Sequence, residues 1–147
     1  MAALIADLSE DEANFKPAPD EFSVSEVLQH LNSSFPRSPE RIRTLASGKP
    51  YRYEGARPLS GGIAEVERLP FEEVRRRFLA GEDEVLAILD AANPTIGLEL
   101  TAEHNEFGPF NWLEWAVYSH HVHTHDHVGQ VSRLRQEIER GRRPASG

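Results

Sequence analysis

The chain has 147 residues, enough for one domain, and 39% of them are hydrophobic, enough for one compact core. Its 24 acidic residues outnumber its 16 basic residues, and the net charge of −8 argues against nucleic acid or an anionic membrane surface as the main partner, because both attract basic proteins. No cysteine is present, no stretch is long and apolar enough to span a bilayer, and the first residues lack the pattern of a signal peptide, so we expect a cytoplasmic protein without disulfides or thiolate metal sites.

Two helices are predicted near the start of the chain. Residues 2–16 are a short and weak helix candidate, which ends before the proline-rich segment 17–19. Residues 23–34 carry a stronger signal. Ser23 and Glu26 fit a capping box, in which each side chain bonds the backbone N–H of the other residue, and an apolar stripe at helical spacing follows.

The middle of the chain is predicted as a long crossover followed by a long helix. Prolines and glycines interrupt residues 35–69 and leave room for one short helix over about 38–45. An irregular stretch of this length in a small domain is often functional. Residues 70–91 form an amphipathic helix that stops at Asn93-Pro94. Its apolar positions are Phe71, Val74, Phe78, Leu79, Val85, Leu86 and Leu89.

The last helix is predicted to be the longest. Residues 95–110 form a loop, and residues 111–139 form a helix with Asn111 as its N-cap. A disordered tail over 141–147 is expected to follow. Because no convincing strand is found, we expect a single all-α domain over 1–140. Its fold is a four-helix bundle with a long crossover between the second and third helices.

Five of the seven histidines lie between His120 and His127, within the last helix. A helical wheel advances about 100° per residue and divides them between two faces. The predicted core face holds Leu113, Ala116, Val117, His120, His123, His127, Val131, Leu134 and Ile138. His121 and His125 fall on the far side, where they could bind only adventitious metal. Trp115, Val122 and Asp126 are expected to face solvent or a subunit contact.

His123 and His127 are four residues apart, so their side chains stand one above the other on consecutive turns. Two histidines on a core face lose hydration, and one divalent ion can satisfy both as neutral ligands. His30 is the best candidate for a third ligand because it borders the apolar stripe of residues 23–34, and His104 is the alternative. Three ligands leave part of the coordination shell open, as in catalytic metal sites.

Three segments of the sequence resemble the DinB/YfiT-like metalloenzymes. Phe22-Ser-Val-Ser-Glu-Val-Leu-Gln-His30-Leu31 is similar to the segment in which that family carries its first metal histidine. Phe107-Gly-Pro-Phe-Asn-Trp-Leu-Glu-Trp115 is similar to the lead-in to the family's last helix, and His123-Thr-His-Asp-His127-Val-Gly-Gln130 to its His-x-x-x-His-x-x-Gln ending. Their order and spacing agree over roughly residues 20–140.

The resemblance implies that His30, His123 and His127 bind a divalent transition metal, zinc or nickel. It also implies a four-helix bundle that commonly dimerises, so we expect a homodimer. Characterised relatives include transferases and isomerases that use a low-molecular-weight thiol. The predicted first helix, over 2–16, is short for this family.

Three functions remain open on the sequence. The leading hypothesis is a metal-dependent enzyme acting on a small molecule, in which the ion lowers the pKa of a bound thiol from a cosubstrate or of a water molecule. Gln130 would orient a ligand or form a plain polar contact. A hydrolase is a rival, although no glutamate lies between His123 and His127 to act as general base. The third hypothesis is a non-catalytic, metal-stabilised bundle for stress response or partner binding, with His104 as a fourth ligand.

Overall fold

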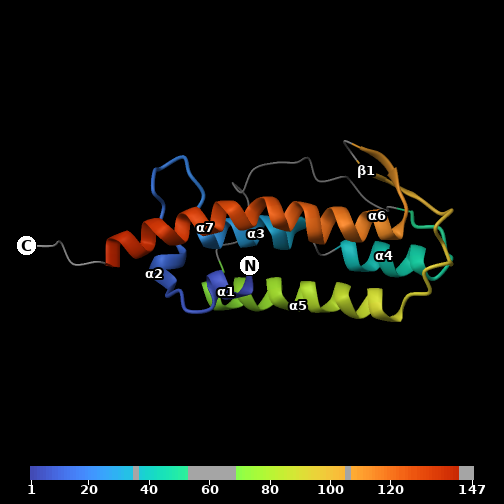
Figure 1. Ribbon diagram of the computed structural model, residues 1–147, viewed down its shortest axis with the longest axis horizontal. Helices are drawn as coiled ribbons and strands as arrows, with labels where there is room; N and C mark the ends of the chain where they lie inside the picture. The colour runs from blue at the N-terminus through green and yellow to red at the C-terminus, as the bar shows by residue number, and fades with distance from the viewer. Residues whose placement is uncertain (35–36, 53–68, 105–106, 143–147) are drawn as a thin grey trace, which may run out of the picture.

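The computed structural model describes residues 1–34, 37–52, 69–104 and 107–142. Over these residues the protein is mostly helical, which confirms the predicted class (Figure 1). None of the helices in the described part is long and apolar enough to cross a membrane. The elements are α1 (Ala2–Ile5), α2 (Glu10–Ala13), α3 (Val24–Ser34), α4 (Ser38–Ala46), α5 (Phe71–Ala91), β1 (Ala102–His104), β2 (Gly108–Phe110), α6 (Trp112–Ala116), the π-helix η2 (Val117–Val122) and α7 (His123–Arg142).

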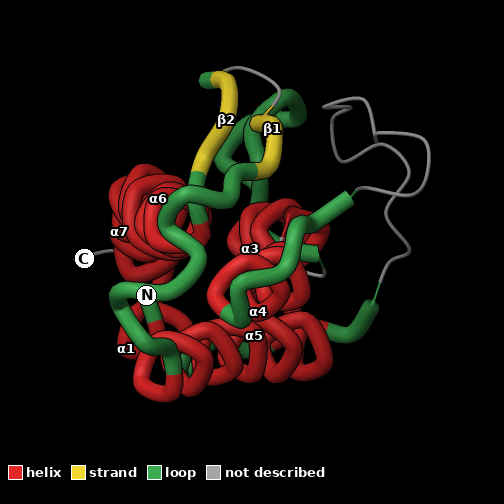
Figure 2. The backbone as a smooth tube through the Cα atoms, turned by 90° about the vertical axis from the view of Figure 1, so that its right-hand side faces the viewer, coloured by secondary structure: helices red, strands yellow, loops and turns green. Residues whose placement is uncertain are grey.

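The long helices run side by side along the length of the molecule. Helices α3 and α4 follow one another, α5 lies below them, and α6, η2 and α7 form one continuous helix above (Figure 1). Seen from the end, three groups lie at the corners of a triangle: α3 with α4, α5, and α6 with α7. Helix α1 lies between α5 and α7 (Figure 2). The count of four bundle helices stays a prediction, because the N-terminal region contributes two four-residue helices rather than one long helix.

The predicted N-terminal helix is interrupted because Ser9 starts a second one. The Ser9 hydroxyl accepts the Glu12 N–H, and the Glu12 carboxylate accepts the Ser9 N–H at 3.0 Å, which forms a capping box for α2. The carboxylate of Glu10 accepts the backbone N–H of Phe71 at 2.8 Å. This contact satisfies an unpaired donor at the start of α5 and attaches the N-terminal region to it.

The helices predicted in the first half and the middle of the chain are present. Ser23 and Glu26 form the expected capping box at 2.9 and 3.2 Å. Helix α4 fills the place of the short helix that we expected within the crossover, and α5 matches the predicted span to within one residue. Leu86 is an exception to the predicted core stripe, since it is 59% exposed. Most of the remaining crossover, residues 53–68, lies outside the described residues.

A small antiparallel hairpin replaces part of the loop predicted over 95–110. Strands β1 and β2 pair Ala102 with Phe110 and His104 with Gly108. Three-residue strands are too short to show the alternation of polar and apolar residues that predicts a strand. Gly108 has a φ of 83°, a backbone conformation that favours glycine.

The last helix begins as predicted, with the Asn111 side chain accepting the N–H groups of Leu113 and Glu114 at 3.0 Å. It then contains a π-helical segment, in which the His123 N–H bonds the Tyr118 carbonyl five residues back. A π-helical turn holds one extra residue, which rotates the preceding part of the helix by about 100°.

That extra residue corrects the predicted core face before residue 120. We expected residues 113, 116, 117 and 120 to face inward. The prediction holds for Ala116, and the His120 side chain is 8% exposed, but the other buried positions are Trp112, Trp115 and Ser119. Leu113 and Val117 are instead 45% and 46% exposed. The prediction that Trp115 faces outward was therefore wrong. After the π-helix the predicted core face is confirmed, since Val131, Leu134 and Ile138 are buried.

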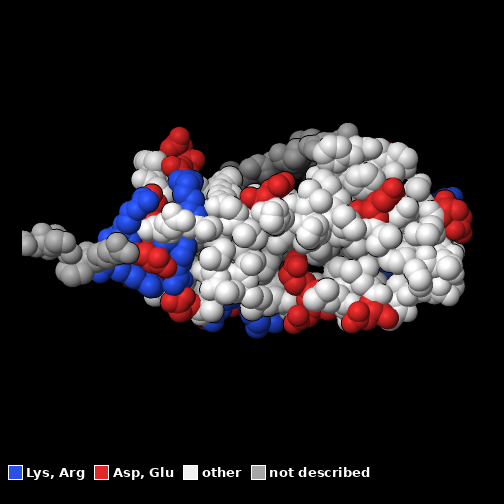
Figure 3. Space-filling model, viewed as in Figure 1, with Lys and Arg blue, Asp and Glu red and all other residues white. Residues whose placement is uncertain are grey.

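Helix α7 extends to Arg142, beyond the predicted domain end at residue 140, and the rest of the expected tail, 143–147, lies outside the described residues. Lys and Arg side chains gather at this end of the molecule (Figure 3). Arg135 donates to both carboxylate oxygens of Asp7 at 2.6 and 2.7 Å, and Arg142 pairs with Glu12. These ion pairs hold the N-terminal segment against α7.

Two apolar clusters form the core, one in each half of the molecule. The first joins α1, α2, α3, the start of α5 and the end of α7; the second joins α4, the end of α5 and α6. Between them, on every long helix, lie residues that belong to neither cluster. We call six of these the polar seam: His30, Ser38, Glu82, His120, His123 and His127.

Candidate metal centre

Three histidines of the polar seam converge on one point. His30 lies near the end of α3, and His123 and His127 lie on the first two turns of α7, which runs beside α3 (Figure 1). The Nε2 atom of His123 is 3.2 Å from that of His30 and 3.3 Å from that of His127. All three residues offer ligand atoms within 4.8 Å of one another. Among the described residues, the structure therefore brings together the three histidines that the sequence predicted as metal ligands.

These distances fit a metal ion. Two nitrogen atoms bound at about 2.05 Å to a tetrahedral zinc ion lie about 3.3 Å apart. A neutral imidazole carries a proton on one nitrogen and a lone pair on the other, so an Nε2 pair at this distance forms a hydrogen bond only where one of the two atoms carries the proton. A cation among the three Nε2 atoms would be coordinated by all three lone pairs, so the residues present fit a divalent transition metal.

Burial favours the neutral form of two of the three histidines, which is the form that binds metal. Desolvation lowers the pKa of His30 below its usual value of 6.5, and the charge of nearby His127 lowers it further. The pKa of His123 is lowered for the same two reasons and by His30 as well. Because a metal competes with a proton for the imidazole lone pair, a lowered pKa favours metal binding near neutral pH.

Gln130 orients the third histidine. Its Oε1 atom lies 2.9 Å from Nδ1 of His127, so Nδ1 carries the proton and donates it to the amide oxygen. The lone pair of His127 is then on Nε2, the atom that faces the other two histidines. Hydrogen bonds of this kind fix the tautomer and ring direction of metal-binding histidines. This contact agrees with the role considered for Gln130 in orienting a ligand.

His104 does not join the three ligands, either as the third or as a fourth. Its ring lies in an aromatic cluster, with ring centroids 4.7 Å from Tyr118 and 5.1 Å from Trp115. Tyr118 in turn stacks on His123, with centroids 6.3 Å apart and planes inclined by 20°. The cluster therefore reaches from the hairpin to the edge of the metal centre, a contact that no sequence pattern indicated.

The other histidines of the last helix lie apart from this group. His121 and His125 are exposed, with ring centroids 6.2 Å apart, which agrees with their predicted place on the far side. His120 was predicted to share the face of His123 and His127. Its side chain instead lies between Ser38 and Glu82.

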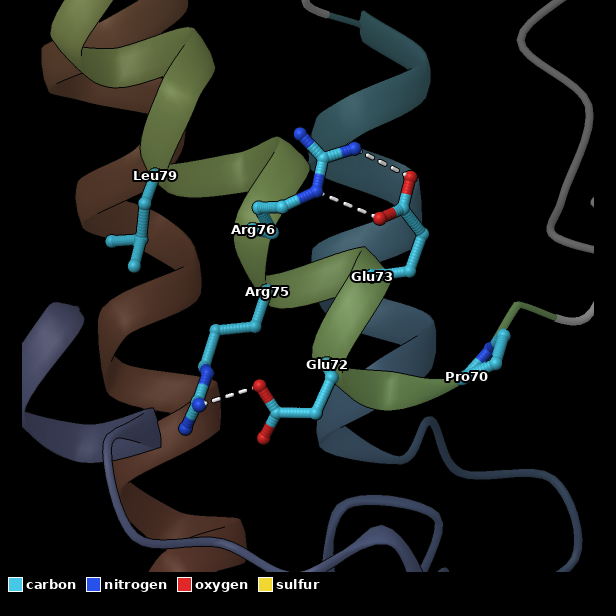
Figure 4. Close-up of a pocket in the computed structure, with 6 residues that line it drawn as sticks. All are labelled: Pro70, Glu72, Glu73, Arg75, Arg76 and Leu79. Atoms are coloured by element: carbon cyan, nitrogen blue, oxygen red, sulfur yellow. Dashed lines mark hydrogen bonds and ion pairs between the residues drawn. The ribbon is translucent and has the colours of Figure 1, made fainter.

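A shallow surface pocket on α5 lies elsewhere and does not include any of the three histidines (Figure 4). Its lining residues are Pro70, Glu72, Glu73, Arg75, Arg76 and Leu79. The guanidinium of Arg76 pairs with both carboxylate oxygens of Glu73, and Arg75 pairs with Glu72. Because these charges neutralise one another, the pocket offers no unpaired charge of α5 to a ligand.

Fold and site together define a helical protein with a candidate three-histidine metal centre built from two helices. The family model for the DinB superfamily matches residues 1–131, a span that includes all three histidines. The chain therefore belongs to the DinB superfamily, which confirms the resemblance seen in its motifs. Comparison with curated proteins and with solved structures gave no match.

Proposed function

We propose that this protein is a divalent-metal-dependent enzyme whose ion, zinc or nickel, is bound by His30, His123 and His127. The observation that carries the proposal is the convergence of the three Nε2 atoms at 3.2 and 3.3 Å. Membership of the DinB superfamily is compatible with it. We further propose a small-molecule substrate, a cytoplasmic location and a homodimer.

An open coordination position supports catalysis over a purely structural role. Among the described residues, the ligand group holds three histidines and no fourth side chain. Structural zinc sites close the shell with four protein ligands, whereas catalytic sites leave a position for water or substrate. The non-catalytic, metal-stabilised bundle remains the second candidate, favoured by the ligands' position between two long helices.

We propose a low-molecular-weight thiol as cosubstrate. The chain has no cysteine, so a thiol nucleophile must come from outside the protein. A bound divalent ion would act as a Lewis acid that lowers the pKa of this thiol. The protein's own residues keep His30 and His123 neutral by burial and hold the His127 ring through Gln130. The hydrolase alternative is weaker, because the ligand group in the described part contains no carboxylate to serve as general base.

The test uses protein loaded with Co²⁺, whose absorption spectrum reports its ligands. Adding small thiols to the Co²⁺ protein should produce a sulfur-to-metal charge-transfer band, and the band should be absent in His127→Ala. The variant with both His121→Ala and His125→Ala is the matched control, since it removes two histidines of the same helix outside the ligand group.

Turnover is then measured with each thiol that binds and a panel of electrophilic acceptors. Thiol consumption that requires the metal would support the transferase. A Co²⁺ spectrum that no thiol changes would contradict the thiol proposal. Thiol binding without turnover across the panel would favour the non-catalytic candidate.

A further inference from the structure

His120 lies between two polar partners at the centre of the polar seam. Its Nδ1 is 3.1 Å from the carboxylate of Glu82 on α5, and its Nε2 is 3.2 Å from the hydroxyl of Ser38, the first residue of α4. The carboxylate accepts a hydrogen bond from Nδ1–H, and Nε2 accepts one from the serine hydroxyl. The side chain of His120 is 8% exposed. One imidazole thus connects three helices inside the molecule.

The serine, histidine and carboxylate follow the order of a hydrolytic triad, but their burial argues against that chemistry. Ser38 is 2% exposed, whereas the Glu82 side chain is 27% exposed. A nucleophilic serine must meet its substrate, and here the hydroxyl is at the buried end of the contact.

His120 lies inside the π-helix η2, which ends directly before His123, the first proposed ligand of α7. π-helical turns are rare within α-helices and are frequent at functional sites. If the extra residue moved toward the C-terminus along the helix, the turns that it passed would rotate by about 100°. Such a movement would turn His123 away from His30. A side chain bonded to two neighbouring helices would oppose it.

We propose that His120, held by Ser38 and Glu82, is a positioning residue for the metal centre: it fixes the π-helix at residues 117–122 and thereby directs His123 and His127 toward His30. The inference rests on the proposed metal binding by these three histidines. His120 itself binds no metal in this scheme, because its two ring nitrogens are bonded to Ser38 and Glu82.

The experiment measures Co²⁺ affinity and the absorption spectrum of the Co²⁺ complex. His120→Leu removes both hydrogen bonds, and we expect affinity to fall about 10–100-fold, as for other partners outside the ligand set. The spectrum should change as well, because the angles between the ligands change. Glu82→Ala should weaken binding in the same direction, and Glu82→Gln, which keeps an oxygen acceptor, should restore most of the affinity.

Val85→Ala is the control for a general loss of stability. Val85 lies on α5 one turn after Glu82 and packs in the second apolar cluster. Its truncation should destabilise the same half of the molecule while leaving the Co²⁺ spectrum unchanged. If His120→Leu fails to fold by circular dichroism, His120→Asn and His120→Gln each keep one of the two hydrogen bonds and take its place.

The outcomes separate the two proposals. Wild-type protein that binds no Co²⁺ at the three histidines would overturn both. Stoichiometric binding by wild type, with unchanged affinity and spectrum in the His120 variants, would overturn the positioning role alone. A spectral change in Val85→Ala equal to that in His120→Leu would show that loss of stability, rather than the contact of His120, disturbs the centre.

Discussion

The Nε2 atom of His123 lies 3.2 Å from that of His30 and 3.3 Å from that of His127, and the chemistry proposed for the site depends on this close approach. Neutral imidazoles form a hydrogen bond here only where one Nε2 carries a proton, and three protonated imidazoles would repel one another. Two of the members were predictable, since residues four apart on a helix share a face. The third, His30, is 93 residues away from His123. Its place beside the apolar stripe of residues 23–34 made it a candidate, and the resemblance of its segment to a family motif then supported it.

Replacement of one ligand tests the site most directly. His127→Ala leaves two imidazoles, and we expect affinity to fall by more than the roughly 10–100-fold that loss of an outer partner costs. Elemental analysis of protein purified without nickel resin should find about one metal ion per wild-type chain and almost none in the variant. The double variant His121→Ala/His125→Ala should retain the wild-type content. A His127→Ala protein that still carries one metal ion per chain would refute the ligand assignment.

The lowered pKa values predict how the stability of metal-free protein depends on pH. Between the folded pKa of His30 and His123 and their usual value of 6.5, the unfolded chain binds more protons than the folded one. Stability is therefore full above about pH 6.5 and decreases as the pH falls through the folded pKa values. Urea unfolding in the presence of a chelator, at steps from pH 7.5 to 5.5, measures this slope.

If the lowered pKa values arise from burial, His30 and His123 must account for the dependence of stability on pH. The double variant His30→Ala/His123→Ala should flatten it, because the two groups that resist protonation are gone. The variant of the exposed pair, His121→Ala/His125→Ala, should keep it. A steep slope that persists without His30 and His123 would place its origin in other residues.

At the scale of elements, the sequence predicted where helices begin better than which way they face. The capping residues Ser23 and Asn111 act locally, so a few neighbouring letters are enough to predict them. The direction of a side chain depends on every turn of the helix before it, so one π-helical turn buried Trp112 and Ser119 and left Leu113 and Val117 exposed, against the prediction. The contact of His120 with Ser38 and Glu82 was invisible in the sequence, because its members are 82 and 38 residues apart from His120.

At the scale of the whole molecule, the polar seam separates two apolar cores that share α5 and the last helix. The first core is held by α3, α7 and the N-terminal segment, which Arg135 and Arg142 attach through Asp7 and Glu12. The second core is held by α4 and α6. A metal ion bound at the polar seam would therefore act where the two halves meet. We expect it to raise the free energy of unfolding of the entire chain.

Metal-linked stability follows from this position. His30 and His123 come together only when α3 packs against α7, so unfolding would separate the proposed ligands and release a bound ion. A ligand that binds only the folded state stabilises it by about 2.7 kcal/mol at 100 times its Kd. Urea unfolding of wild-type protein should give a midpoint that rises with free zinc and falls with a chelator. His127→Ala should show one midpoint in both solutions, lower than or equal to that of metal-free wild type. If the urea midpoint of the wild-type protein does not change with free zinc, a zinc ion does not join α3 to α7.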